Sequence, residues 1–262
     1  VLCNREIKFR EFLDHADRLG AKYIATGHYA QIDSNPTALS LLKGNDPSKD
    51  QSYFLYTLGQ AELQHTLFPI GTMLKSEVRQ IARSLGMPNA DRKDSTGICF
   101  IGERRFRDFL ARYLPPSPGQ ICTLDDTVIG EHQGLWFYTL GQRHGLNIGG
   151  PGDAWYVAAK DMSRNVLRVV QGHDHPALMR DSAQAEELSW VENDPPQFPF
   201  RCSAKTRYRQ ADQACTLSRI GPDKIEITFE QPQRAITPGQ ALVLYDGSRL
   251  IGGGVFCDLI NG

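Results

Sequence analysis

The hydrophobic pattern of this chain changes its period near residue 115, and this change restricts the folds that are open to it. Before that point, apolar residues recur at helical spacing between short apolar runs, as is typical of an α/β domain. After a Pro-rich break at residues 115–119, the pattern alternates in short runs separated by turn residues. We therefore expect an α/β first part followed by structure that is largely β.

The first region carries the signals of two helices and two short strands. The apolar spacing predicts helices over residues 5–19 and 74–85 and strands over 23–26 and 38–43. Ligands of open α/β sheets lie at the carboxyl ends of strands, which would place Gly27 and His28 beside a nucleotide. A plain strand-to-loop turn explains the same two residues, and both interpretations stay open.

The rest of the chain predicts a small mixed region and then an all-β region. In the middle region, strands are predicted at 121–124, 128–129, 135–138, 155–158 and 166–170, the last two as a hairpin. From about residue 174, strands are predicted at 186–191, 201–205, 214–218, 224–229, 240–245 and 251–257. Short strands at such close spacing favour a small closed barrel or a sandwich.

Two polar segments are candidates for ligand binding. Lys49, Asp50 and Gln51 precede an aromatic helix and either start that helix or present a charge and an amide to a ligand. The run 205–209 interleaves basic and aromatic residues, which suits RNA because cations meet phosphate and rings stack on bases. A solvated strand face would give the same run.

Two of the six cysteines are candidates for a reactive thiol. Cys99 stands in a Gly-bounded loop ahead of a predicted helix, where the helix dipole and nearby arginines favour the reactive thiolate, and Cys3 lies at the start of the chain. The alternative is an inert, buried thiol. The six cysteines form no C-x-x-C pair, so we expect no metal site and a reducing, cytoplasmic compartment. The run His173-Asp174-His175 is interpreted as a polar turn.

Length and charge set wide limits. A chain of 262 residues allows two or three domains, and it has no apolar run of the roughly 18 residues that a membrane span needs. Its 29 basic and 30 acidic residues favour no class of partner, so an RNA site must come from local patches.

Six ordered motifs carry a resemblance to a known family. VLCNREIKF at residue 1, YIATGHYA at 23, SKDQSYFLY at 48, DSTGICFIG at 94, TLGQRHGL at 139 and TRYRQ at 206 resemble the bacterial tRNA-specific 2-thiouridylases. The resemblance covers essentially the whole chain. It implies an α/β plus β fold: the C-terminal part of a Rossmann-type PP-loop domain (1–104), a small central tRNA-binding domain (105–174) and a C-terminal β-barrel (175–262).

The resemblance also implies a reaction. Family members use ATP, with Mg²⁺, to adenylate the C2 carbonyl of the wobble uridine in tRNAs for Lys, Glu and Gln, and they replace that oxygen with sulfur from a protein donor. Cys99 matches the cysteine that carries the persulfide, and Cys3 matches its catalytic partner. Gly27 matches an ATP contact. The remaining matches are to tRNA contacts, namely Lys49, Asp50, Gln51, Arg207 and Tyr208.

One departure from the family pattern is large. The family's phosphate-binding S-G-G-x-D-S loop is not found in this sequence, and its aspartate before V-L-C would fall ahead of Val1. We therefore expect the chain by itself to be unable to adenylate uridine.

Two rival classes make different demands on the sequence. A non-catalytic RNA-binding protein that uses the central and barrel regions would need neither Cys3 nor Cys99. Another PP-loop enzyme, such as an argininosuccinate-synthase-like ligase, would need neither the GICFIG cysteine nor the barrel.

Overall fold

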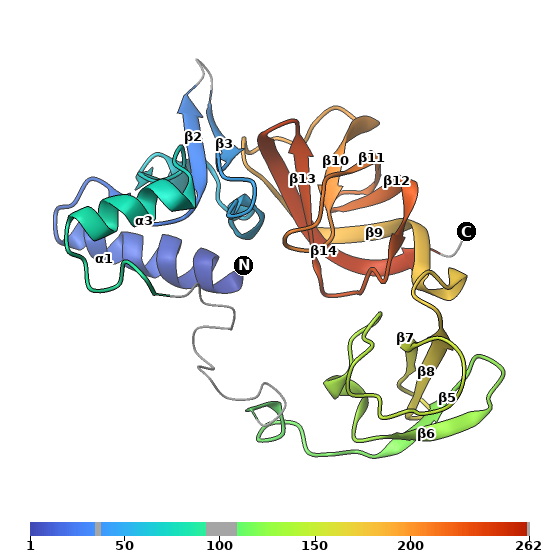
Figure 1. Ribbon diagram of the computed structural model, residues 1–262. Coiled ribbons are helices and arrows are strands. Elements are labelled where there is room, and N and C mark those ends of the chain that lie inside the picture. Colours follow the sequence, from blue (N-terminus) through green and yellow to red (C-terminus); the bar gives the residue numbers. More distant parts are fainter. Residues whose placement is uncertain (35–37, 93–108, 261–262) are drawn as a thin grey trace. The chain divides into compact units, whose positions relative to one another are not determined.

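The computed structural model describes residues 1–34, 38–92 and 109–260, and these residues divide into two compact units (Figure 1). The first unit joins residues 1–92 with 181–231 and the stretch from 238 onward. The second unit contains the described part of 93–180 together with 232–237. The α/β plus β class predicted from the sequence is confirmed.

The N-terminal part of the first unit is α/β. A π-helix, η1 (Cys3–Glu11), continues directly into α1 (Phe12–Arg18), so the helix predicted over 5–19 exists but begins two residues earlier and is wound differently. The helix ends at Arg18, and Gly20, two residues later, has a φ of 77°, the left-handed conformation that glycine adopts most easily. Two short parallel strands pair in this part, β1 (Ile24–Ala25) and β4 (Thr66–Leu67).

Five further elements complete this part. They are β2 (Ala30–Ser34), β3 (Leu39–Lys43), the 3₁₀ turn η2 (Ser52–Leu55), α2 (Gln60–Leu63) and α3 (Lys75–Ser84). Two of them, β2 and β3, join this part to the barrel sheet. The strand β2 was not predicted. It pairs with β3 in antiparallel orientation. The strand β3 in turn pairs with β14 of the barrel sheet, where Leu41 lies opposite Leu250.

The helix α3 is one residue shorter at each end than the predicted 74–85, and none of its residues is buried. Three residues of its predicted apolar face are exposed: Leu74 by 42%, Ile81 by 47% and Leu85 by 71%. In the described structure, this helix therefore presents apolar surface to solvent.

Six strands close into a β-barrel (Figure 1). They are β9 (Met179–Trp190), β10 (Phe200–Lys205), β11 (Gln213–Gly221), β12 (Lys224–Arg234), β13 (Ala241–Asp246) and β14 (Arg249–Ile260). The sheet order β13-β10-β11-β12-β9-β14 is closed by pairing of β13 with β14, which leaves no free edge in the barrel as described.

The barrel and the α/β part share one hydrophobic core. Phe9 and Leu41 from the N-terminal part and Val243 and Tyr245 from β13 are all buried in it. The contact is close at Gly253, where a Cβ atom would stand 2.3 Å from the Leu242 carbonyl oxygen and 2.7 Å from the Tyr56 ring. Loop 44–52 and the barrel thus belong to one packed body.

The second unit is built on a four-stranded sheet in the order β6-β5-β8-β7. Its strands are β5 (Gly119–Cys122), β6 (Val128–His132), β7 (Trp155–Asp161) and β8 (Val166–Gln171), and η4 (Pro176–Leu178) follows them. The predicted hairpin is confirmed as β7 and β8. The strand predicted at 135–138 is wrong, because this segment contains the 3₁₀ turn η3 (Leu135–Phe137). A four-residue apolar run does not distinguish a strand from a buried turn.

No helix in the described ranges combines the length and the apolar character needed to cross a membrane.

Candidate nucleic-acid interface

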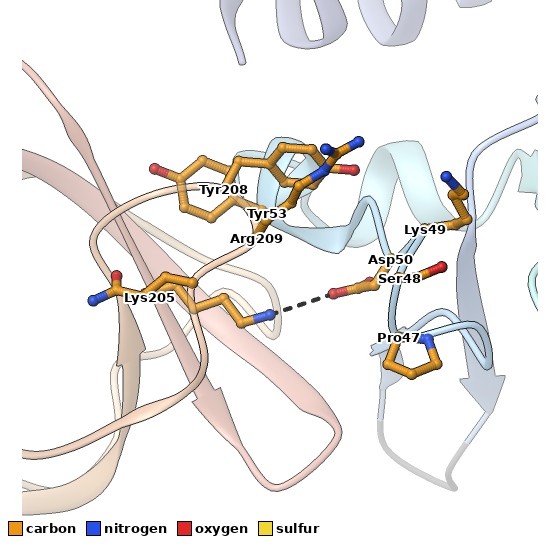
Figure 2. Close-up of a pocket in the computed structure, with 9 residues that line it drawn as sticks. Pro47, Ser48, Lys49, Asp50, Tyr53, Lys205, Tyr208 and Arg209 are labelled. Atoms are coloured by element: carbon orange, nitrogen blue, oxygen red, sulfur yellow. Dashed lines mark ion pairs between the residues drawn. The ribbon is translucent and has the colours of Figure 1, made fainter. Parts of the chain in front are cut away.

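A pocket of about 380 Å³ in the first unit brings the two candidate ligand-binding segments together (Figure 2). One wall comes from the loop before η2 and the other from the loop that follows β10 in the barrel. The lining residues are Pro47, Ser48, Lys49, Asp50, Tyr53, Lys205, Tyr208, Arg209 and Gln210. Three residues singled out from the sequence, Lys49, Asp50 and Tyr208, therefore face one cavity although they lie far apart in the chain.

Buried carboxylates hold the first wall in shape. Asp50 accepts hydrogen bonds from the backbone N–H groups of Gly44 (3.0 Å) and Ser52 (3.1 Å). Asp46 accepts one from the Lys75 N–H at the start of α3 (2.9 Å), and this bond and those from Ser48 lower the pKa of the Asp46 carboxyl. The loop is thus closed on itself and fastened to a helix.

Gln51 is also used inside the protein. Its Oε1 accepts a hydrogen bond from the Tyr29 N–H at 3.1 Å, and its own N–H donates to the Tyr29 carbonyl at 2.9 Å. Of the three residues predicted to contact tRNA in this loop, Asp50 and Gln51 therefore stabilise the loop, and Lys49 and Asp50 line the pocket.

The second wall is a tight loop that presents an aromatic ring and a guanidinium. Gln210 Oε1 accepts hydrogen bonds from the Thr206 N–H (2.8 Å) and hydroxyl (2.9 Å), which closes the loop. Arg209 has a φ of 67°, a left-handed conformation that is uncommon for a residue other than glycine. Its guanidinium lies 5.4 Å from the centre of the Tyr208 ring.

Aromatic contacts join the two walls. The Tyr208 ring lies 4.4 Å from Phe54 and 6.1 Å from Tyr53, measured between ring centres. Burial raises the pKa of Tyr53 to about 12, and the positive charge of Arg207 opposes part of that shift. Arg207 is half-buried in the same loop but is not among the lining residues.

Cys3 lies on a helix that contacts the first wall. The thiol is exposed at the start of η1, and the next residue, Asn4, donates a side-chain hydrogen bond to the Phe54 carbonyl at 3.2 Å. Phe54 in turn packs against Tyr208. The exposed cysteine is therefore linked through two contacts to the pocket.

Gly27 lies at the carboxyl end of β1 and is exposed. A Cβ atom there would meet only Ile70 Cδ1, at 4.0 Å, so packing within the described residues does not require a glycine at this position. The next residue, His28, is buried beside Phe9 and Phe68, and burial together with the charge of Lys8 lowers its pKa to about 4. His28 is thus an uncharged residue of the core, and the open position is at Gly27.

Cys99, with the whole of residues 93–108, lies outside the described residues. Among the residues that are described, no three His, Cys, Asp or Glu side chains are grouped so that they could hold a metal ion. In the run 173–175, His173 pairs with Asp174, and His175 accepts a hydrogen bond from the Ala177 N–H at the start of η4. This run is the polar turn that the sequence predicted.

The sequence did not single out Tyr53, Phe54 and Gln210 as parts of the site. Phe54 and Tyr53 belong to a segment predicted as an aromatic helix, and only the fold places their rings against Tyr208. Lys205 and Arg209 stand in the interleaved run, so that run was the signal for them.

Comparison with known protein families covers nearly the whole chain. Residues 1–103 match the family described as tRNA methyl transferase HUP domain, residues 107–171 match its PRC-barrel domain, and residues 180–256 match the aminomethyltransferase beta-barrel domain. Together with the pocket, these matches define the class as a HUP-domain protein with two appended β-domains, related to tRNA-modifying enzymes.

Individual relatives narrow this class. The chain is 57% identical to the tRNA-specific 2-thiouridylase MnmA of Nitrosomonas europaea over 97% of its own length and 72% of that protein. It is 58% identical to the protein of the same name from Ralstonia nicotianae, over 97% of the chain and 70% of that protein. The chain belongs to the tRNA-specific 2-thiouridylase family.

Proposed function

We propose that the protein is a tRNA-uridine 2-sulfurtransferase that thiolates the wobble uridine of tRNAs for Lys, Glu and Gln. Family membership supports the activity. The single observation that carries the RNA side is the pocket, in which Lys49 and Tyr208 come together from two distant segments. A pocket lined by basic side chains and by tyrosine rings suits an unpaired stretch of RNA.

The division of the chain follows the family resemblance. We assign residues 1–104 to the PP-loop domain, 105–174 to the central tRNA-binding domain and 175–262 to the β-barrel. The first and third of these share a core in the structure, which gives the pocket two walls from different domains.

Cys99 and Cys3 are assigned the sulfur chemistry. Cys99 carries the terminal sulfur as a persulfide, and the exposed Cys3 thiolate attacks the inner sulfur of that persulfide. The S–S bond to the terminal sulfur breaks, sulfide leaves with the electron pair, and a Cys3–Cys99 disulfide forms. The alternative is direct transfer of the terminal sulfur to uridine with assistance from Cys3.

The described residues fit a nucleotide at the end of β1. A methyl group placed on Gly27 would have no neighbour closer than 4.0 Å, and this open space, with no side chain in it, allows close approach of a ligand to the backbone. When bound, ATP supplies the adenylyl group that makes the uridine C2 oxygen a good leaving group. Mg²⁺ is assigned to the phosphates of ATP, which are its usual ligands in nucleotide sites.

The partners follow from the reaction. The substrate is tRNA, and a sulfur-donor protein, either a cysteine desulfurase or a relay protein, loads Cys99. Because tRNA and its decoding are cytoplasmic in bacteria, we assign the protein to the cytoplasm.

The test is a thiolation assay with the full-length enzyme, unmodified tRNA, ATP and a sulfur donor. We expect Cys99→Ser and Cys3→Ser to abolish 2-thiouridine formation, measured by mass spectrometry of the digested tRNA, while tRNA binding is retained. Normal thiolation by Cys99→Ser would contradict the assignment of the persulfide. If the unsubstituted full-length protein binds tRNA but forms no 2-thiouridine, and neither cysteine substitution changes that binding, the non-catalytic RNA-binding alternative is favoured instead.

A further inference from the structure

Two lysines and two aspartates form a charged cluster where loop 44–52 meets the barrel. Lys205 Nζ lies 3.7 Å from Asp50 Oδ2, the pair that Figure 2 marks, and 3.7 Å from Asp212 Oδ1. Lys43 Nζ lies 2.5 Å from the other oxygen of Asp212. These four residues, here called the Lys205 cluster, carry two positive and two negative charges, so their net charge is zero.

The Lys205–Asp50 pair is largely removed from solvent, whereas the side chains of Lys43 and Asp212 are 20% and 35% exposed. The side chains of Lys205 and Asp50 are only 13% and 6% exposed. The Tyr245 ring lies against both ammonium groups, with its centre 4.3 Å from Lys43 Nζ and 5.2 Å from Lys205 Nζ. A buried pair of this kind strongly resists loss of one partner, because the other charge would be left uncompensated.

Hydrogen bonds connect the cluster to the aromatic residues of η2. The Ser52 hydroxyl donates to Asp50 Oδ2 at 3.0 Å and lies 3.1 Å from the Tyr245 hydroxyl. Since Ser52 begins η2, which carries Tyr53 and Phe54, the cluster is connected to the rings that pack against Tyr208.

The positions of the four residues give the cluster a mechanical role. Lys205 ends β10 and Asp212 lies just before β11, so the two residues bracket the barrel loop that contains Arg207 and Tyr208. Asp50 belongs to the opposite wall, and Lys43 ends β3. The cluster therefore fastens both ends of the barrel loop to the part of the chain that carries Lys49.

We propose that Lys205 is a positioning residue for tRNA binding, which holds the two walls of the pocket at the spacing that RNA requires. The proposal rests on the proposed function. It adds that Lys205 acts by holding the two walls in place and makes no contact with phosphate. Its charge is already compensated by two aspartates, so it releases no counterions from RNA. Its contribution is preorganisation, which lowers the cost of ordering the loop upon binding.

The salt dependence of tRNA binding separates this role from a phosphate contact. Binding of an unmodified transcript of the lysine tRNA is measured by filter retention at several salt concentrations. We expect Lys205→Met to weaken binding about tenfold, which is the size of effect typical of energetically coupled neighbouring residues. The slope of log K against log salt should not change. Arg207→Met, as a phosphate contact, is expected to lower the slope by about one.

Two further variants complete the design. Lys205→Arg keeps a positive charge between the aspartates and is expected to recover most of the affinity. Lys224→Met removes another ion-paired lysine of the barrel, 3.1 Å from Asp258, and is expected to bind like the unmodified protein. Thermal melting of each variant shows whether it is folded at the assay temperature.

The outcomes are distinct. Unchanged affinity of Lys205→Met, or a slope lowered by about one, would overturn the positioning role. If Lys205→Met has no cooperative melting transition, Lys43→Met replaces it, with the same pattern expected and the same results overturning the role. If Arg207→Met changes neither affinity nor slope, Arg207 is removed from the RNA interface. If Lys49→Met, which alters the pocket itself, also leaves the affinity unchanged, the proposed interface is wrong and the positioning role falls with it.

Discussion

Replacing Asp50 by Asn tests whether the first wall of the pocket is held by a buried carboxylate. Asp50 is 7% exposed; one of its oxygens accepts two backbone N–H groups, and the other accepts the Ser52 hydroxyl and faces Lys205. An amide can keep the first set of bonds. Its NH₂ group would then stand where the Ser52 hydroxyl and the Lys205 ammonium both require an acceptor.

The expected loss of stability follows from these contacts. A hydrogen bond to a charged group contributes about 1.5–3 kcal/mol, and removing one partner of a buried ion pair costs about 3–5 kcal/mol. Because Lys205 keeps Asp212 as a partner, we expect the lower end, about 3 kcal/mol. For a folding unit of roughly 150–250 residues, this corresponds to a fall in Tm of about 6–12 °C.

Urea unfolding followed by circular dichroism measures this difference. The matched control is Asp91→Asn, which removes a carboxylate that is 74% exposed and paired with Arg83 at 2.7 Å. Such a surface pair contributes at most about 1 kcal/mol. An Asp50→Asn variant as stable as the Asp91→Asn control would refute the bracing role and would favour direct contact of Asp50 with tRNA.

Two more predictions concern the end of β1. Burial first, and Lys8 second, lower the pKa of His28 from 6.5 to about 4, so the unfolded chain takes up a proton that the folded chain refuses between these pH values. The free energy of unfolding should therefore fall by on the order of 2–3 kcal/mol as the pH drops from about 6.5 to about 4. Urea unfolding of His28→Gln at the same pH values should show a smaller fall, and an equal fall would contradict the lowered pKa of His28. Gly27→Val should change the free energy of unfolding by no more than about 0.5 kcal/mol, since a Cβ atom at this position would lie 4.0 Å from its nearest neighbour. The same variant should weaken ATP binding by the full-length enzyme about tenfold, as measured by calorimetry. Unchanged ATP affinity would remove Gly27 from the nucleotide site.

Local patterns predicted most of the strands and failed where the pattern was short. Each of the six barrel strands overlaps a predicted run, although β9 begins seven residues before its run. Alternation of buried and exposed residues is the signal in strands such as β12, whereas β13 is a continuous apolar run buried from Leu242 to Tyr245. The run at 135–138 has no such alternation and forms a 3₁₀ turn. The strand β2 was missed because its pairing with β3, rather than its own composition, makes it a strand.

The candidate site was predictable in part. The motifs marked Lys49, Asp50, Gln51 and Tyr208 through resemblance, but they assigned all four the same kind of role. In the structure, Lys49, Asp50 and Tyr208 line the pocket, but Asp50 also bonds to backbone groups of its own loop, and Gln51 bonds to Tyr29 and does not line the pocket. No spacing in the sequence distinguishes these roles, because each depends on a partner elsewhere in the chain.

Local patterns and the order of motifs were enough to predict the class of fold and the family, and they are the basis for proposing sulfur chemistry at the two cysteines, because they depend on residues close together in the chain. Only the tertiary structure decided which side chains form the pocket and how its walls are fastened. The contact of Lys205 with Asp50 joins two segments that are distant in the chain, and its geometry depends on closure of the barrel and on packing of Tyr245 between the two parts. Contacts of that range come from the folded chain as a whole, and local periodicity carries no information about them.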